Sequence, residues 1–473
     1  MCKLVLLVIS LIFSQVASAI SIDWTGGYRI EFHDIDNPSL DSNAKQPKTY
    51  GLQYLYLNPK IVASDGINII GRFNILGNQT PAYRNSQLGS VFGSGGGTVE
   101  PKINSQNQEA SSIGVSQLYL NVNHEYGSLI AGRAPFEFGM GITHNAGLGE
   151  FDHWYDTRDS AGYKFLVDNI SFMYMLSKVS QKDFGRGVTA TDDTLLFEYN
   201  NKDNGAQAGV VQVNRKSSLQ SNDALGTAIT PVNPLPPFTT ATLLGGWSTK
   251  TVNLFFGRSW ETFKLKMEAS FLTGETGLVM AGEEVKFNAH AIAAELLFPQ
   301  QEGSKWEFGA KLGFASGDKQ STTNIYEGYQ FDKNYDVAML LFNHRMGQRD
   351  FLTTGITHAD AGTGLNVGNS ADDEAIGNVT YIAPSAKYQW SEKLDIKSTL
   401  IYAQLTVNPT LTLDTSKDLG TELDIELIYK PRERVTWSNQ LGVLLPGAAW
   451  KDGASNLENK TNIGISTKAA ITF

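Results

Sequence analysis

The chain is poor in cysteine and proline, with 1 Cys and 15 Pro among 473 residues. So few cysteines exclude a disulfide scaffold and a zinc module built on Cys ligands. A collagen-like chain is excluded too, because it needs far more proline. An excess of apolar residues is also missing, since the mean hydropathy is slightly negative. This excludes a polytopic helical membrane protein, but not a membrane barrel, whose lumen face is polar.

A basic excess is absent as well, because 48 acidic residues outnumber 38 basic ones and give a net charge of −10. Nucleic-acid binding is therefore disfavoured, since phosphate recognition needs a basic face. The length of 473 residues exceeds the roughly 250–300 residues over which one hydrophobic core grows. The chain therefore has either two or three domains or an architecture that is exempt from this limit.

The first nineteen residues have the pattern of a secretory signal. Lys3 precedes an apolar run over residues 4–13, and Ala17-Ser18-Ala19 forms a small-residue cleavage site. The run is too short to cross a bilayer as a helix, which disfavours an uncleaved anchor. We expect a signal peptide over 1–19 and a mature domain over 20–473. Cleavage would remove Cys2 and Lys3, which leaves a mature chain without thiols and with a net charge of −11.

From residue 20 onward, apolar and polar residues alternate with a period of two. The pattern is clearest over 22–32, 306–315, 419–429 and 463–473. Such alternation predicts strands with two different faces. Each run spans about 9–11 residues or slightly more, which suits a tilted strand that crosses a bilayer. A soluble β-sandwich is the alternative, and it would have shorter strands and loops of more even size.

The connections between the expected strands alternate between short and long, and the long ones include 77–113, 139–161, 214–250 and 316–378. This pattern predicts an all-β fold: a transmembrane antiparallel up-and-down β-barrel with short periplasmic turns and long extracellular loops. We expect about 18 strands, with 16 or 20 as alternatives, because an even number places both termini on the short-turn side. The expected strands are 22–32, 50–62, 67–76, 114–123, 128–138, 162–167, 170–177, 194–199, 206–213, 251–259, 263–272, 285–298, 305–315, 379–390, 394–403, 419–429, 435–444 and 461–473.

Aromatic residues gather beside the expected short turns, as in the girdles of membrane barrels. The members of this expected girdle are Trp260, Trp306, Trp390, Trp437, Tyr126, Tyr199 and Tyr429.

Three parts of the chain resemble known barrels. The terminal Phe473 after alternating apolar residues resembles the last strand of bacterial outer-membrane barrels. Residues 132–142 (GRAPFEFGMGI), 314–318 (FASGD) and 335–344 (YDVAMLLFNH) are similar to porin-like barrels of the alginate-export type. The resemblance implies 18 strands, solute passage and insertion by the outer-membrane barrel assembly machinery. It does not imply an alginate substrate, because the expected lumen charges are mixed rather than basic.

Charged residues on the polar face of the expected strands are candidates for lining the pore, either as a solvated lumen with cross-strand ion pairs or as a selective constriction. Arg133 and Glu137 are the leading constriction candidates, because they precede the long loop 139–161. The pore-lining candidates are Arg29, Glu31, Arg72, Arg133, Glu137, Lys164, Lys264, Lys266, Glu268, Glu307, Lys311, Asp395, Lys397, Glu422, Asp424, Glu426 and Lys468.

Two long loops carry further candidates. Loop 139–161 could fold inward and narrow the pore through Asp152, Asp156, Arg158 and Asp159. Its acids also suit a divalent cation, but no regular calcium-loop spacing is present, so no metal is expected. Residues 324–346 include an apolar stretch, Leu340-Leu341-Phe342, which should be buried as a plug or cap.

These features predict an outer-membrane porin-like channel for passive diffusion of small hydrophilic solutes, secreted across the inner membrane of a Gram-negative cell. A structural or adhesive barrel closed by its loops is the alternative, followed by an outer-membrane hydrolase. The seven histidines lie in no recognisable hydrolase motif, so we expect no catalytic residues, no enzyme activity and no cofactor. The expected partners are outer-membrane lipid, the assembly machinery and small solutes. Monomer and trimer both stay open.

Overall fold

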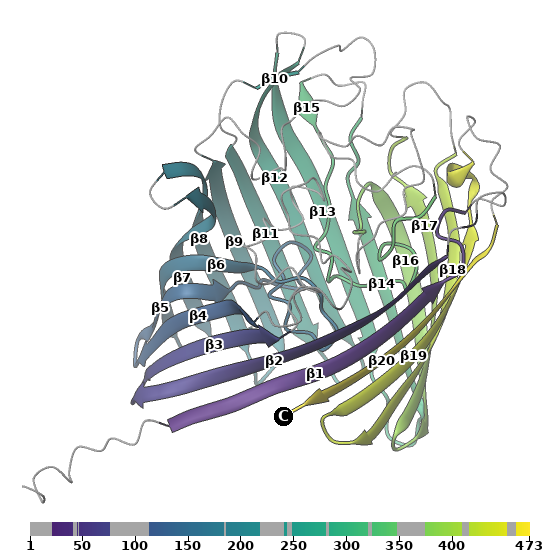
Figure 1. The fold of residues 1–473 in the computed structure, drawn as a ribbon, viewed down its shortest axis with the longest axis horizontal. Helices are drawn as coiled ribbons and strands as arrows, with labels where there is room; N and C mark the ends of the chain where they lie inside the picture. Colours follow the sequence, from purple (N-terminus) through teal and green to yellow (C-terminus); the bar gives the residue numbers. More distant parts are fainter. Residues whose placement is uncertain are drawn as a thin grey trace, which may run out of the picture.

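Figure 1 shows the protein as a computed structural model, in which one sheet curves round to close on itself. The structure describes residues 21–40, 45, 47–75, 113–183, 186–217, 241–243, 248–280, 283–319, 324–347, 374–408, 416–451 and 460–473. The expected signal peptide and most of the expected loops 77–113 and 214–250 therefore lie outside the described residues.

The described residues form a 20-stranded sheet. Two of its strands, β10 (Ala241–Leu243) and β15 (Ile325–Tyr326), are short additions beside β12 and β13. The other eighteen strands form the barrel wall, and each pairs antiparallel with its neighbours. They are β1 (Ser21–Ile35), β2 (Lys48–Ser64), β3 (Ile67–Ile75), β4 (Ile113–His124), β5 (Gly127–Pro135), β6 (Thr157–Val167), β7 (Ile170–Asp183), β8 (Arg186–Asn201), β9 (Ala206–Ser217), β11 (Ser248–Ser259), β12 (Lys264–Met280), β13 (Glu283–Phe298), β14 (Trp306–Ala315), β16 (Val379–Ser391), β17 (Leu394–Leu405), β18 (Asp418–Arg432), β19 (Val435–Pro446) and β20 (Asn462–Thr472).

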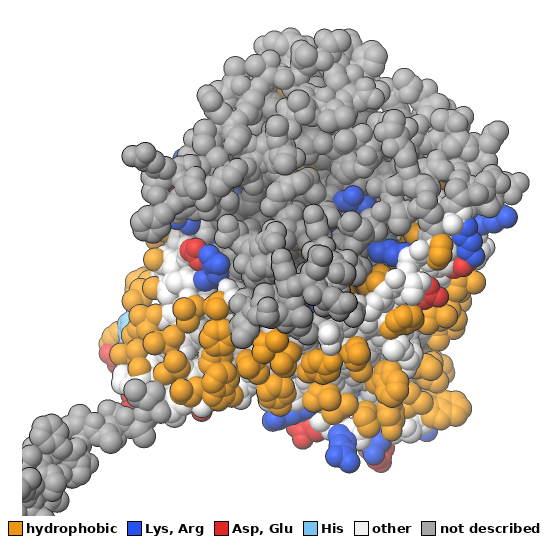
Figure 2. Space-filling model, in the orientation of Figure 1, with side chains coloured by type: hydrophobic (Ala, Val, Ile, Leu, Met, Phe, Trp, Pro, Cys, Tyr) orange, Lys and Arg blue, Asp and Glu red, His pale blue; other side chains and the backbone are white. Residues whose placement is uncertain are grey.

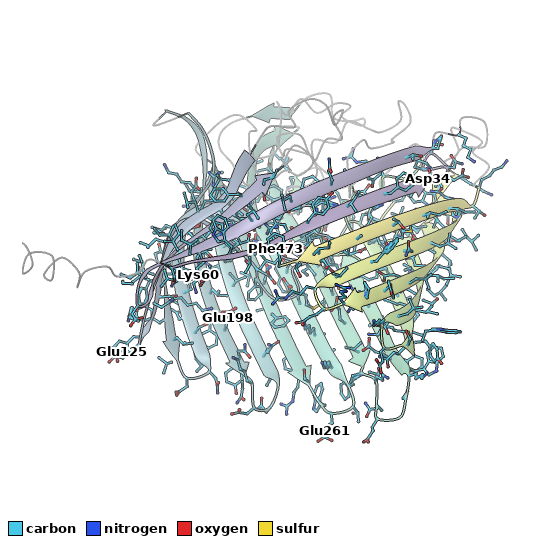
Figure 3. The ribbon with its side chains drawn as sticks, turned by 60° about the horizontal axis from the view of Figure 1, so that its bottom comes forward. Asp34, Lys60, Glu125, Glu198, Glu261 and Phe473 are labelled. Atoms are coloured by element: carbon cyan, nitrogen blue, oxygen red, sulfur yellow. The ribbon has the colours of Figure 1, made fainter. Side chains whose placement is uncertain are left out.

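The first and last strands close the barrel. They pair antiparallel from Gly27 opposite Thr472 to Ile35 opposite Gly464. Beyond the end of β20, the backbone of Phe473 exchanges two hydrogen bonds with Gly26, at 2.8 and 3.0 Å. Figure 3 shows Phe473 lying against β1 at this seam. Among the eighteen long strands that the structure describes, closure pairs both edges of every strand, which is the condition for a sheet that spans a membrane.

The expected barrel of about 18 antiparallel strands is confirmed, and every expected strand overlaps an observed one. The largest differences are in β6, β7, β8 and β12, which extend several residues farther toward the long-loop end. Residues there carry charge on both faces, as in Arg158-Asp159 and Asp192-Asp193. Alternation of apolar and polar residues requires an apolar outer face. It is therefore absent from the strand ends that extend beyond the apolar belt.

Tight turns connect the strands at one end of the barrel. The β2–β3 turn is Asp65-Gly66, and Gly66 takes the left-handed backbone conformation (φ +76°) that such two-residue hairpins favour. The β6–β7 turn is Asp168-Asn169, and Asp168 has a φ of +51°. Figure 3 places Glu125 and Glu261 at this end, opposite Asp34 at the long-loop end of β1.

Apolar side chains cover the outer face of the barrel. Figure 2 shows them as a band across the face in view, with charged side chains below it. The aromatic residues expected at the girdle are exposed there, except for the half-buried Tyr199; the exposed members are Trp260, Trp306, Trp390, Trp437, Tyr126 and Tyr429. In the described part of the chain, no helix has the length and apolar character needed to cross a membrane.

Candidate functional site in the barrel lumen

The inner face of the wall carries most of the expected pore-lining residues. Their outward neighbours, such as Ile30, Phe271 and Leu423, are exposed apolar residues, and alternate residues of a strand point to opposite faces. The inward members are Arg29, Glu31, Arg72, Lys164, Lys264, Lys266, Glu268, Glu307, Lys311, Asp395, Lys397, Glu422, Asp424, Glu426 and Lys468.

Residues 136–156, between β5 and β6, fold into the lumen and are called loop 136–156 here. Polar wall residues hold its backbone. Glu268 accepts a hydrogen bond from the Met140 amide at 2.6 Å. Arg29 donates to the Asp152 and Glu150 carbonyls at 2.7 and 3.2 Å, and Arg72 donates to the Gly147 carbonyl at 3.3 Å. These charged side chains are buried, so they anchor the loop.

A second segment, residues 324–347, fills the opposite side of the lumen and is called segment 324–347. Glu422 accepts hydrogen bonds from the Leu340 and Leu341 amides, both at 2.7 Å. Asp424 accepts one from the Met339 amide at 2.9 Å. The predicted burial of the apolar stretch is confirmed, because these leucines and Phe342 are at most 2% exposed.

The wall behind segment 324–347 is apolar, unlike the wall behind loop 136–156. Inward-facing residues of β13, β16 and β17 form one buried cluster with the segment, and they include Ala289, Ala291, Ala293, Tyr381, Ala383, Ile401 and Ala403. The small alanines leave room in which the aromatic rings of the segment pack against the strands.

The two inward-folded parts are bonded to each other. The Thr143 and Tyr329 hydroxyls lie 2.6 Å apart, and the Asp332 amide donates to the Ile142 carbonyl at 2.8 Å. Asn334 makes two bonds to the backbone of Trp154, at 2.7 and 3.1 Å. Loop 136–156 and segment 324–347 are therefore joined directly to each other as well as to the wall.

A buried ion network fixes the end of loop 136–156. Arg158 donates two hydrogen bonds to Asp156, at 2.9 and 2.7 Å, and forms an ion pair with Asp192 at 2.9 Å. Arg215 pairs with the other oxygen of Asp192 at 2.6 Å. All four side chains are nearly inaccessible to solvent. Two guanidinium groups thus balance two carboxylates. Removing any one of the four would leave a buried charge without its partner, which is strongly destabilising.

The network shifts the pKa values of the loop groups that join it. The pKa of His144 is lowered to about 4, because burial, with the charges of Arg158 and Arg215, outweighs the contact with Asp156. Burial alone would raise the pKa of Asp156, but the charge of Arg158 and the bond with His144 outweigh it and hold that pKa well below its usual range. His144 is therefore neutral and Asp156 ionised at neutral pH.

A second buried cluster joins loop 136–156 to β1. The Glu31 carboxylate lies 2.9 Å from Arg29, 3.0 Å from His153 and 3.4 Å from His33. The ring of His33 also approaches His344 of segment 324–347, with centroids 6.4 Å apart. The wall and both inward-folded parts therefore meet around one carboxylate.

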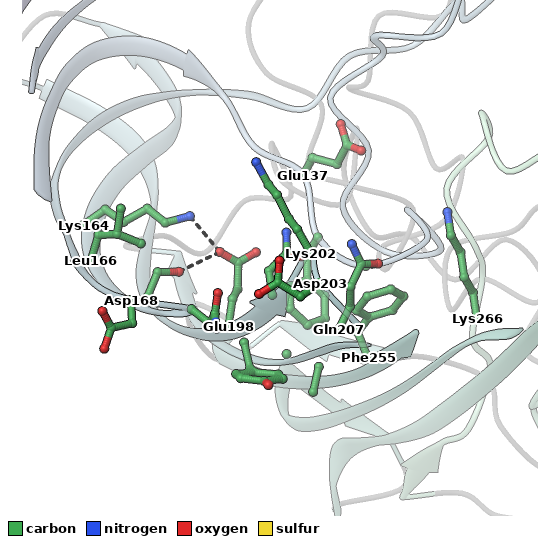
Figure 4. Close-up of a pocket in the computed structure, with 18 residues that line it drawn as sticks. Glu137, Lys164, Leu166, Asp168, Glu198, Lys202, Asp203, Gln207, Phe255 and Lys266 are labelled. Carbon is green, nitrogen blue, oxygen red and sulfur yellow. Dashed lines mark hydrogen bonds and ion pairs between the residues drawn. The ribbon is translucent and has the colours of Figure 1, made fainter. Parts of the chain in front are cut away.

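A cavity of about 910 Å³ lies on the short-turn side of loop 136–156. Figure 4 shows Glu198 at its wall, bonded to Lys164 at 2.7 Å and to Ser171 at 3.0 Å. Glu137 and Lys266 border it from the loop and from β12. Phe138 and Phe255 add aromatic surface. The cavity therefore offers water and small solutes a polar space of mixed charge.

The structure contradicts two constriction candidates. Arg133 lies opposite Leu118, which is 53% exposed on the outer face, and pairs with Asp159 at 2.7 and 2.8 Å. Because directly opposed residues share a face, both Arg133 and Asp159 point outward. The alternation gave the wrong face because Phe136 and Phe138 are apolar, which predicts an outward position for them and an inward one for Arg133. In the structure these two rings pack inside the barrel against Met173.

The other loop candidates lie inside the barrel. Glu137 borders the cavity just beyond the end of β5, and Asp152 lies within loop 136–156. Asp156 is buried at the end of that loop, and Arg158 belongs to β6. The sequence analysis did not identify their partners Asp192 and Arg215. A signal was available, because each is a charged residue at an inward position followed by a charged residue at an outward one (Asp193 and Lys216).

Comparisons with known proteins extend the description of the fold. No family model matches the chain, and no curated protein matches it. Among solved structures, OpdQ of Pseudomonas aeruginosa is 12% identical with a TM-score of 0.50, covering 96% of this chain and 98% of that one. OccK11 (OpdR) of the same organism is 8% identical, with a TM-score of 0.49 and 96% of both chains covered.

A BenF-like porin from Pseudomonas fluorescens Pf-5 is 9% identical, with a TM-score of 0.48, and covers 96% of this chain and 98% of that one. At these identities a likeness concerns the fold alone. Together with the closed antiparallel wall and its apolar outer band, the likeness to OpdQ shows that the chain has the fold of an outer-membrane porin barrel.

Proposed function

We propose that the protein is an outer-membrane channel through which small hydrophilic solutes diffuse passively. The observation that carries the proposal is the pair of inward-folded parts, loop 136–156 and segment 324–347, held across the lumen of a closed barrel. Barrels of 16–18 strands are wide enough to hold a water-filled path. Loops anchored inside such a barrel narrow that path and decide which solutes pass.

The inward charged residues divide into two groups under this proposal. Buried groups such as Arg29, Glu268 and Glu422 bind loop backbone and are structural anchors. Partly or fully exposed groups are the proposed lining of the solute path: Lys164, Lys264, Lys266, Glu307, Lys311, Asp395, Lys397, Glu426 and Lys468. Ion pairs within this lining, such as Lys387 with Glu307 at 2.8 Å, reduce its fixed charge.

Conductance in a planar lipid bilayer tests the proposal. The purified full chain should insert and give discrete ion-conducting steps at constant voltage. Liposome swelling with sugars of increasing size should then show a size limit. A barrel that is folded and inserted but gives no steps and no swelling would refute the channel.

A structural barrel closed by its loops is the second candidate, favoured by the full burial of Phe331 and Leu340 inside the lumen. The bilayer experiment separates the two, because only a channel conducts. A hydrolase is not proposed.

The cellular route is also part of the proposal. We infer that residues 1–19 direct export and are removed, and that the assembly machinery inserts the barrel through its C-terminal strand. Mass measurement of the mature protein from outer membranes would test the cleavage site before Ile20. The resemblance to alginate-export barrels stays a sequence prediction, and transport of an anionic polysaccharide is not proposed.

A further inference from the structure

Polar residues form a continuous row across the outer face of strands β5 to β9 and β11 to β13. Figure 1 shows that these strands are neighbours in the barrel. Each member lies directly opposite the next in the strand register, so all point to the same, outward side. The row runs Arg133, Asp159, Lys178, Thr191, Lys216, Ser248, Glu275 and Lys286.

From β7 to β13 the row lies just above the apolar belt, whereas at β5 Arg133 lies opposite the exposed apolar Leu118 of β4. Two to six residues farther toward the short turns, the same strands present exposed apolar side chains, among them Leu176, Leu195 and Phe271. Asp193 and Lys250 lie between the row and this belt, also on the outer face. An apolar outer wall that turns polar marks the level at which lipid tails give way to headgroups.

The charge of this surface is positive. Arg133, Lys178, Lys216, Lys250 and Lys286 supply five cations against the four carboxylates of Asp159, Asp193, Glu275 and Glu284. Two of these carboxylates are engaged, because Asp159 holds Arg133 in a bidentate pair and Asp193 accepts the Tyr174 hydroxyl at 2.8 Å.

Lys216 and Lys250 form the centre of this surface. Lys216 lies opposite Ser248, two residues from Lys250 on the same face of β11, so their Cβ atoms are about 7–8 Å apart. Both side chains are exposed, and within the described ranges neither forms an ion pair. Long lysine side chains on a barrel wall reach toward the headgroup layer while their stems stay in the apolar region.

We propose that the Lys216–Lys250 surface binds the phosphate groups of the phosphorylated glycolipid, lipopolysaccharide, in the outer leaflet. Phosphate groups carry the complementary charge, and acyl chains of the same molecule would lie on the apolar residues below. The site is on the wall and takes no part in solute passage, so it stands independently of the proposed channel.

The experiment compares retention of lipopolysaccharide by the purified full chain and by a Lys216→Gln/Lys250→Gln variant. We expect the double variant to retain the lipid about three- to tenfold more weakly, as two exposed charge contacts are lost. The matched control is Lys393→Gln/Lys430→Gln at the short-turn end, which should retain lipid like the parent. Dephosphorylated lipopolysaccharide should bind the parent as weakly as the variant, and so should the intact lipid in about 1 M salt, where charges are screened within about 3 Å.

Equal retention by the parent and the Lys216→Gln/Lys250→Gln variant would overturn the proposal. So would a change from oligomer to monomer with retention unaltered, because the surface would then contact a second copy of the chain. Folding of each variant is followed by the heat-dependent mobility of the barrel in detergent gels. If the double variant does not fold, the parent alone still decides, since equal binding of intact and dephosphorylated lipid would refute phosphate recognition. Bilayer conductance of the folded double variant should equal that of the parent.

Discussion

Loop 136–156 and segment 324–347 both enter the lumen, but the wall holds them by different means. The loop is held by polar groups: Glu268, Arg29 and Arg72 bind its backbone, and the Arg158 network fixes its end. The segment combines two carboxylate anchors with a large apolar contact against β13 to β17. Polar anchoring depends on each partner being present, whereas apolar packing is spread over many side chains.

This difference predicts that single substitutions disturb loop 136–156 more sharply than segment 324–347. The largest expected effect is that of Arg158→Met. It leaves Asp156 buried without its main partner and removes one of two cations from Asp192. Breaking a buried pair costs about 3–5 kcal/mol, so the free energy of unfolding in detergent should fall by that amount.

The control for Arg158→Met is Lys387→Met, which breaks the partly exposed pair with Glu307. This change should cost about 0–1 kcal/mol, because solvent screens the pair. An equal loss of unfolding free energy in the two variants would contradict the division of the inward charges into buried anchors and exposed lining residues.

Glu422→Leu tests the anchor of segment 324–347. It leaves the Leu340 and Leu341 amides without their acceptor. Two unsatisfied buried amides cost about 2–4 kcal/mol, but the apolar cluster should keep the segment inside. Protease digestion should cut the segment faster than in the parent, with Glu422→Gln intermediate because one acceptor oxygen remains. Unchanged digestion in Glu422→Leu would show that packing alone holds the segment.

A change of pH distinguishes the two regions through His144. Its pKa is about 4 in the folded protein and about 6.5 when unfolded. Between these values the unfolded chain binds the proton and the folded chain does not, so stability falls as pH falls. From pH 7 to pH 5 the loss should be about 2 kcal/mol. The depressed pKa of Asp156 acts only below about pH 4, because the unfolded carboxyl titrates there.

The measurement for His144 is the unfolding midpoint in urea at pH 7 and pH 5, for the parent and for His144→Asn. The asparagine variant should lose less stability on acidification than the parent. His124→Asn, a change to an exposed histidine near a short turn, should keep the full pH response. An undiminished pH response in His144→Asn would contradict the assignment.

The two regions also differ in how far the sequence reveals them. Segment 324–347 was predictable as a buried stretch, because Leu340-Leu341-Phe342 is apolar outside the strands. The wall was predictable too, since lipid forces the outer face to be apolar in every strand. The anchors of loop 136–156 could not be predicted, because the sequence pattern of a charged inward residue is the same whether the side chain faces water or binds the backbone of a loop. The orientation of Arg133 could not be predicted for a similar reason. Apolar residues occupy both faces around β5, so the pattern does not show which face is outward.

The smallest expected effect concerns the contact between the two regions. Thr143 and Tyr329 join them through one hydroxyl pair at 2.6 Å, and the Tyr329 hydroxyl also donates to Ser270 at 2.7 Å. Thr143→Val and Tyr329→Phe each remove one partner while keeping most of the side-chain shape. Each should cost about 1 kcal/mol, and the double variant should cost less than the sum, because the shared bond is lost only once.

A double-mutant cycle on unfolding free energy measures this coupling, and Ser270→Ala provides the control. Ser270 belongs to β12, so its bond to Tyr329 ties the segment to the wall and not to the loop. If Thr143→Val is coupled to Tyr329→Phe but additive with Ser270→Ala, loop 136–156 and segment 324–347 support each other directly. Full additivity of Thr143→Val with Tyr329→Phe would mean that the hydroxyl pair adds nothing to the support between the two regions, which would then rest on the bonds of Asp332 to Ile142 and of Asn334 to Trp154.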